Sequence, residues 1–345
     1  MLEGTLRFHP FLPEQALVPR DVLVPWMERI EAVSDGRIAF RHFPAMQLGG
    51  RPAELVDHVV DGVADVIWTL PCYTPGRFPR TEVFELPFVM EDPEATSRAL
   101  WRVAEAEMLD TDVADMKVIG DGVHGPGVIH SDVPITTTDD RQGLDLRPPT
   151  RVTRQLVGAL GANLVGMPMP QMAEALARGV IGGAIVPWEV AGAIRFSEFV
   201  SNHTGFEGPA PYTAVFPVAM NRAKYDALAD DLKAIIDVNS GLAFSAEATV
   251  ATAAVDTGPR QAAVDRGNNI IRLTAEQSVE WQAAAEPTIR GLGRAGHDWT
   301  ASTRRPFSTP PDRRSRRPAR WSVGSEQDCS PLPPGNSPAL APGTL

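Results

Sequence analysis

One stretch of the chain, from Gly143 to Glu189, constrains the fold more than any other. Short apolar runs alternate there with segments of helical periodicity, and Gly161 and Gly179 lie where the helices should stop. The predicted elements are strand Leu144–Leu146, helix Thr153–Leu160, strand Asn163–Gly166, helix Gln171–Arg178 and strand Gly183–Val186. Such repeats build a parallel sheet with helices on its faces, and such sheets bind ligands beyond the carboxyl ends of their strands. The sequence therefore predicts an α/β fold with a ligand site at those ends.

Arg147 follows the first of these predicted strands directly. Pro148 and Pro149 come next and restrict the backbone around it. A guanidinium at this place can hold a carboxylate through two parallel hydrogen bonds. Arg151 lies close by, and two interpretations of it stand: it supports Arg147, or it is a solvated arginine at a helix start.

Several separated blocks carry a resemblance to a known family. They are FPAMQLGG from Phe43, PRTEVFELPFVMEDPE from Pro79, the Leu-Arg-Pro-Pro turn from Leu146, and the run from Gly161 to Pro168. In this order they resemble the DctP-like solute-binding proteins of tripartite ATP-independent periplasmic (TRAP) transporters, over roughly Thr5 to Gly296. The resemblance implies a two-lobe, periplasmic-binding-protein-like α/β fold with a hinge and a long helix that spans both lobes.

The predicted organisation has four segments. Residues 1–124 form a first α/β lobe, residues 125–218 the hinge crossing and a second α/β lobe, and residues 219–296 a long helix and a return segment across both lobes. Within the long helix, which we expect from Arg222 to about Asn269, Gly258–Pro259 predicts a break.

Residues 297–345 differ from the rest of the chain. They are rich in proline and arginine and show no apolar periodicity, so we predict a disordered tail. A frameshift near Gly293 to His297 is one explanation, and a genuine disordered tail is the other.

The charge and cysteine content exclude several classes of protein. The 345 residues carry a formal net charge of −11, whereas a nucleic-acid binder needs a basic stripe. An acidic body also repels anions at long range, so an anion site must depend on a local arginine. Cys72 and Cys329 are the only cysteines, which excludes a disulfide framework.

Localisation follows from the resemblance alone. The chain as given carries no export signal, since Met1–Gly4 leads at once into the first predicted strand. No apolar run is long enough to span a membrane. The resemblance implies a periplasmic protein, and monomer is the state expected for the family.

Aromatic residues fall at other predicted strand ends and loops. They are Trp68 and Tyr73 in the first lobe, and Trp188, Tyr212 and Phe216 in the second. They form either an apolar box around the body of an organic acid or ordinary core and interlobe packing. His9, in the segment His9–Phe11, faces the cleft in the family arrangement, although a histidine in a plain strand–loop corner is the alternative. His124, near the predicted hinge, is the other remaining candidate.

A departure from the family pattern bears on the ligand. Dicarboxylate and sialic-acid members commonly have a polar Asp-Gly-Gln-Glu-Asn strand end, whereas this chain reads Gly-Gly-Ala-Ile-Val at 182–186. Val186 thus replaces an amide. Glu189 either replaces the lost polar anchor or is a solvated glutamate at a helix start. The hypothesis is a monocarboxylate with an apolar or aromatic body rather than a C4-dicarboxylate.

The resemblance implies an extracytoplasmic receptor that captures an organic acid by hinge closure, with Arg147 as anchor, and delivers it to a TRAP membrane permease. The alternative is a sensor that presents the closed form to a receptor kinase. An enzyme on the same scaffold is a third class. The sequence contains no metal-ligand spacing, nucleophile elbow, P-loop or dinucleotide fingerprint, so we expect no catalysis, metal or cofactor.

Overall fold

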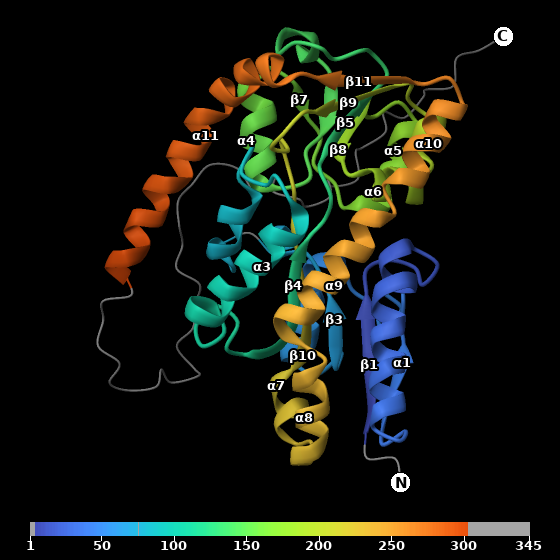
Figure 1. The fold of residues 1–345 in the computed structure, drawn as a ribbon, viewed down its shortest axis with the longest axis vertical. Helices are drawn as coiled ribbons and strands as arrows, with labels where there is room; N and C mark the ends of the chain where they lie inside the picture. Colours follow the sequence, from blue (N-terminus) through green and yellow to red (C-terminus); the bar gives the residue numbers. More distant parts are fainter. Residues whose placement is uncertain (1–3, 75, 303–345) are drawn as a thin grey trace, which may run out of the picture.

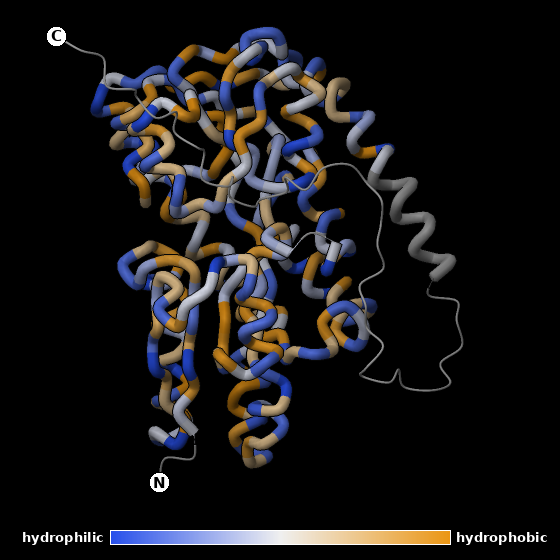
Figure 2. The backbone as a smooth tube through the Cα atoms, turned by 180° about the vertical axis from the view of Figure 1, so that it is seen from behind, coloured by the Kyte–Doolittle hydropathy of each residue, from blue (hydrophilic) through white to orange (hydrophobic). Residues whose placement is uncertain are grey.

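The computed structural model describes residues 4–74 and 76–302. Figure 1 shows two α/β lobes, one above the other, each built around one sheet. In the lower, first lobe the strand order is β2-β1-β3-β10-β4, and in the upper, second lobe it is β11-β9-β5-β8-β6-β7. Figure 2 shows hydrophobic stretches within both lobes. The predicted two-lobe α/β fold is confirmed.

The strands are β1 (Gly4–Pro10), β2 (Ile38–His42), β3 (Val66–Trp68), β4 (Met116–Val123), β5 (Val128–Ser131), β6 (Asp145–Arg147), β7 (Asn163–Leu164), β8 (Gly183–Val186), β9 (Asn202–Phe206), β10 (Val215–Asn221) and β11 (Asn269–Leu273).

The α-helices are α1 (Val24–Val33), α2 (Leu55–Val60), α3 (Pro93–Val103), α4 (Arg151–Ala159), α5 (Met172–Ala177), α6 (Trp188–Ala193), α7 (Arg222–Asp226), α8 (Asp230–Val238), α9 (Gly241–Ala254), α10 (Thr257–Asp265) and α11 (Ala275–Ser302). Shorter 3₁₀ or π turns are η1 (Pro19–Leu23), η2 (Pro52–Glu54), η3 (Pro71–Tyr73), η4 (Pro79–Glu85), η5 (Ala104–Met108), η6 (Asp139–Arg141), η7 (Met169–Gln171) and η8 (Phe196–Glu198).

The segment from Gly143 to Glu189 folds largely as its pattern predicts. β6 pairs in parallel with both β7 and β8, and α4 and α5 connect these strands. Thr150 caps the N-terminus of α4, because its side chain accepts a hydrogen bond from the backbone N–H of Thr153. β7 is shorter than expected, and Arg147 is the last residue of β6 rather than the residue after it.

Two chain crossings connect the lobes. β4 of the first sheet leads into β5 of the second, and β9 of the second leads back to β10 of the first. The crossing segments touch where the backbone N–H of Gly127 donates to the Tyr212 carbonyl at 2.9 Å. A Cβ atom at Gly127 would lie 2.6 Å from Tyr212 Cδ1, so only glycine permits this close approach.

A run of helices also passes from one lobe to the other. The predicted single helix from Arg222 to about Asn269 is instead a series of helices, α7 to α10, of which α9 packs on β4 and α10 packs on α6 (Figure 1). The break between α9 and α10 falls at Val255–Asp256, directly before the predicted Gly258–Pro259. Proline is tolerated in the first turn of a helix, which explains why α10 begins just before Pro259.

Helix α11 covers part of the second lobe, against α4 and β11. Its Trp281 is 1% exposed and packs edge-on to Phe206 of β9 at 5.1 Å between ring centroids. The Arg141 guanidinium carbon lies 3.9 Å from the Trp281 ring centroid, a cation–π distance. α11 continues to Ser302, past the predicted boundary at 297, and the rest of the predicted tail lies outside the described residues.

We expect Trp281→Ala to lower the free energy of unfolding by about 3–5 kcal/mol, because it removes a large buried ring and its contacts with Phe206 and Arg141. Val279→Ala, at a position on the same helix that is 60% exposed, should change it by no more than about 0.5 kcal/mol. Urea denaturation of both variants measures this. Equal stability of Trp281→Ala and the parent chain would show that α11 does not stabilise the second lobe.

Candidate functional site

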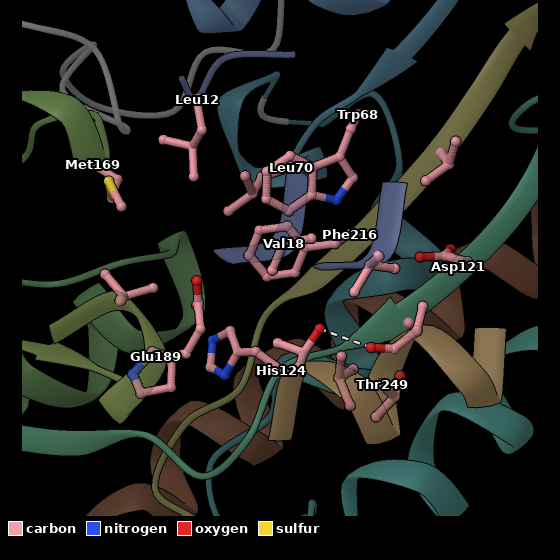
Figure 3. Close-up of a pocket in the computed structure, with 18 of the residues that line it drawn as sticks. Leu12, Val18, Trp68, Leu70, Asp121, His124, Met169, Glu189, Phe216 and Thr249 are labelled. Carbon is pink, nitrogen blue, oxygen red and sulfur yellow. Dashed lines mark hydrogen bonds between the residues drawn. The ribbon is translucent and has the colours of Figure 1, made fainter. Parts of the chain in front are cut away.

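A cavity of about 80 Å³ lies between the lobes (Figure 3). Carboxyl ends of parallel strands from both sheets meet there, bringing Trp68 of β3, Arg147 of β6 and Val186 of β8 to one place. Open α/β sheets bind ligands at this position. The sequence-based prediction of a site at these strand ends therefore agrees with the geometry.

Arg147 supplies a buried positive charge to the lining. The residue is 3% exposed, and its Nε donates to the Met167 carbonyl at 3.1 Å. Its other N–H groups make no hydrogen bond, and no carboxylate lies within ion-pair distance of it, among the residues that the structure describes. Burying a charge without a partner is unfavourable by several kcal/mol. The guanidinium is therefore poised to pair with an anion in the cavity.

Aromatic rings form one wall. Tyr73 lies edge-on to Phe11, Phe11 stacks on Trp68 with centroids 4.8 Å apart, and Trp68 stacks on Phe216 at 5.4 Å. Figure 3 shows Trp68 and Phe216 near the middle of the pocket. Burial raises the pKa of Tyr212 well above its usual value, while the nearby Arg147 charge opposes that rise. A flat apolar ring can be enclosed by this wall next to the guanidinium.

Helix α9 supplies another wall, through Phe244, Ser245 and Thr249. It approaches β4 closely because Gly120 and Gly122 have no side chains. A Cβ atom at Gly120 would lie 2.4 Å from the Phe244 ring, and one at Gly122 would lie 2.8 Å from the Thr249 hydroxyl.

A buried carboxyl group, Glu189, and a half-buried one, Asp256, lie close together near the cavity. The backbone N–H of Glu189, in the first turn of α6, donates to Asp256 Oδ1 at 2.7 Å. Burial, and secondarily the Asp256 charge, raises the pKa of Glu189 to about 7. Burial raises the pKa of Asp256 to about 6, although the hydrogen bond from Glu189 opposes this. Glu189 lines the cavity, and because its pKa is about 7 its charge changes with pH near neutrality.

The structure brings most of the predicted site residues together. Those that line the cavity are Arg147, Trp68, Tyr73, Glu189, Tyr212 and Phe216. Trp188 is not one of the lining residues. It packs on the buried His130 and His203, and its ring centroid lies 4.9 Å from each imidazole centroid.

His9 and Arg151 also lie away from the cavity. His9 is fully buried, its Nδ1 lies 2.9 Å from the Phe43 carbonyl, and its ring stacks on His58. Arg151 is the first residue of α4, its side chain is 31% exposed, and it forms an ion pair with Glu82 of η4, with Nε and Oε1 2.9 Å apart. This position fits the interpretation as an arginine at a helix start. This pair joins α4 of the second lobe to the first lobe.

Sequence reasoning did not assign ligand contact to several lining residues, notably Leu12, Met169 and Thr249, whereas it placed the segment His9–Phe11 at the cleft and named His124 as a candidate. No sequence pattern predicts Thr249, because its position at the cavity depends on how α9 crosses the first sheet.

Residues 11–294 match the sequence model of DctP, described as bacterial extracellular solute-binding protein, family 7. A TRAP solute-binding protein from Rhodoferax ferrireducens, solved with copurified benzoate, is 44% identical, covers 86% of this chain and 93% of its own, and has a TM-score of 0.83. One from a marine metagenome, described as specific for aromatic acid ligands and solved with 3-hydroxybenzoate, is 40% identical, covers 87% and 94%, and has a TM-score of 0.83.

A curated relative, the C4-dicarboxylate-binding periplasmic protein DctP of Rhodobacter capsulatus, is 26% identical over 279 residues, which are 75% of this chain and 78% of that protein. Two lobes, paired crossings and a cavity between them define a solute receptor of the periplasmic-binding-protein type. The chain belongs to the DctP family of bacterial extracellular solute-binding proteins. The predicted family and extracytoplasmic class are confirmed.

Within the described part of the chain, no helix is both long and apolar enough to cross a membrane. The same residues contain no group of three or more His, Cys, Asp or Glu side chains placed to hold a metal ion.

The raised pKa values of Glu189 and Asp256 predict a pH dependence of stability. Between about pH 4 and pH 7 the folded protein keeps protons that the unfolded chain releases. The contribution of the two carboxyl groups to the free energy of unfolding is therefore fully present below about pH 4 and is lost as the pH rises through about 7. Glu189→Gln removes one titrating group. We expect this variant to gain stability relative to the parent by on the order of 3 kcal/mol between pH 5 and pH 8.

Denaturant titrations at each pH measure the difference. Glu174→Gln, on an exposed ion pair with Arg178, is the matched control and should follow the parent. Parallel pH profiles for Glu189→Gln and the parent would contradict the assignment.

Proposed function

We propose that the protein binds an aromatic or similarly apolar monocarboxylate in the interlobe cavity and delivers it to the membrane permease of a TRAP transporter. The observation that carries the proposal is the buried Arg147 guanidinium, which has no carboxylate partner among the described residues and lies at a wall of stacked aromatic rings.

The lining favours one carboxylate over two. Arg147 can pair with one carboxylate. At the strand end where dicarboxylate relatives commonly carry an amide, this chain has Val186, which is 2% exposed. A second carboxylate would also meet Glu189, which becomes negatively charged above about pH 7. The relatives solved with benzoate and 3-hydroxybenzoate, at 44% and 40% identity, support an aromatic body.

Binding would couple to closure of the lobes. The cavity takes its lining from both lobes and from the crossing segments, so a ligand makes all of its contacts only when the lobes are together. The ligand's carboxylate would pair with Arg147 and its ring would contact Trp68 and Phe216. This is the action of a receptor rather than an enzyme, and the family match favours transport over presentation to a sensor kinase.

A ligand panel tests the proposal. At saturating ligand, benzoate and hydroxybenzoates should raise the unfolding temperature, since a hundredfold excess over Kd adds about 2.7 kcal/mol, whereas succinate and malate should not. Arg147→Ala should weaken benzoate binding at least hundredfold by calorimetry, because it removes a desolvated charge pair. Arg147→Lys should restore little, because the ammonium lacks the planar fork.

Arg178→Ala is the matched control, because this arginine directly after α5 is exposed and its ion pair within the described residues is with Glu174 of that helix. It should leave affinity unchanged within about twofold. Stabilisation by succinate or malate alone, or unchanged benzoate affinity in Arg147→Lys, would overturn the proposal.

A further inference from the structure

His124 lines the cavity and has a ring nitrogen without a hydrogen-bond partner among the described residues. It follows β4 at the crossing between the lobes, lines the cavity and is 3% exposed. Its Nδ1 lies 2.5 Å from the Gly125 carbonyl oxygen. Its other ring nitrogen, Nε2, is buried and makes no hydrogen bond with any residue in the described part of the chain.

The contacts fix which nitrogen carries the proton. A carbonyl oxygen only accepts, so Nδ1 must donate to Gly125. The Thr213 hydroxyl donates to the His124 carbonyl at 3.0 Å, and its oxygen lies 3.4 Å from Nδ1, where it can accept from the same N–H, so this contact is compatible with the tautomer. Burial lowers the pKa of His124 to about 4, so the ring is neutral at physiological pH. Nε2 therefore presents a lone pair and no proton.

Aromatic neighbours hold the imidazole in this orientation. Tyr212 packs edge-on to it at 4.8 Å and Phe216 lies at 5.7 Å between ring centroids. Phe216 belongs to the aromatic wall, so His124 lies next to the space that a ligand ring would fill. In Figure 3 the Glu189 side chain lies at the same end of the pocket. That end is polar, whereas the wall beside it is apolar.

We propose that the cavity selects aromatic acids that carry a hydroxyl group, and that His124 Nε2 accepts the hydrogen bond from this hydroxyl. The inference rests on the proposed function and narrows its ligand class. A buried acceptor without a donor is unfavourable, and a site built to bind a hydroxyl discriminates against the analogue that lacks it. Glu189 in its protonated form can donate to the same hydroxyl oxygen, which has a free lone pair.

The experiment compares ligands that differ by the hydroxyl alone. Calorimetry at pH 7 would measure Kd for benzoate, for the 2-, 3- and 4-hydroxybenzoates, and for the matching fluorobenzoates, whose fluorine is of similar size but cannot donate. We expect at least one hydroxybenzoate to bind ten- to hundredfold more tightly than benzoate, and its fluoro analogue to bind no more tightly than benzoate.

Two variants locate the effect. His124→Asn keeps a donor for the Gly125 carbonyl but removes the acceptor at the Nε2 position. The Kd values of this variant for hydroxybenzoate and benzoate should therefore lie within about threefold of each other. His124→Gln can place its amide oxygen near that position and should retain part of the preference. Trp68→Leu is the control, because Trp68 belongs to the aromatic wall but stacks on Phe11 and Phe216 rather than on His124. It should weaken benzoate and hydroxybenzoate by the same factor.

The outcomes separate this inference from the function on which it rests. Tight benzoate binding with no gain from any hydroxyl would overturn the inference and leave the proposed function standing. So would a preference that persists unchanged in His124→Asn. If no aromatic acid binds, the proposed function fails, and the hydroxyl selectivity fails with it.

Discussion

The buried charge of Arg147 is the constraint on which the site depends. Two prolines after β6 and the bond from Nε to the Met167 carbonyl hold the guanidinium at the edge of the second sheet. In water its charge would be well solvated, but at 3% exposure that solvation is lost. An anion that enters the cavity supplies the missing partner. Desolvation of the guanidinium makes the empty closed form unfavourable. In the occupied form the same lack of water strengthens the attraction between the guanidinium and the bound anion.

The aromatic wall explains why a single arginine is enough. Trp68 and Phe11 come from the ends of strands in the first lobe, Phe216 comes from β10 of the same sheet, and Tyr212 comes from the returning crossing. Their rings exclude water and so strengthen a charge pair at Arg147. They also offer a flat apolar surface that a sugar acid or a short dicarboxylate would contact poorly. Specificity thus comes from what surrounds the charge more than from the charge itself.

The sequence predicts what depends on local pattern. Alternating apolar runs and glycine stops located β6, α4, β8 and the strand end at Arg147, and the resemblance located the hinge. It could not predict the side-chain environment of Trp188, which follows a strand as Trp68 does but lies on His130 and His203. Nor could it predict that Arg151 reaches Glu82, because that pair forms only when the lobes meet. Long-range packing determines the contacts of such residues, and the periodicity of the sequence carries no information about that packing.

The protein's own contacts across the cleft are individually modest. Arg151 and Glu82 remain 31% and 18% exposed at their side chains, so solvent screens their attraction. The Cys72 thiol donates to the Pro149 carbonyl at 3.6 Å, a weak bond, and the Tyr73 hydroxyl accepts from the Met169 N–H at a long 3.5 Å. Such contacts align the lobes without committing them to closure. A bound carboxylate adds a desolvated charge pair at Arg147, so the equilibrium between open and closed forms follows ligand occupancy. Weak direct contacts and one strong ligand-dependent contact are what a receptor needs if a permease is to distinguish its loaded form from its empty one.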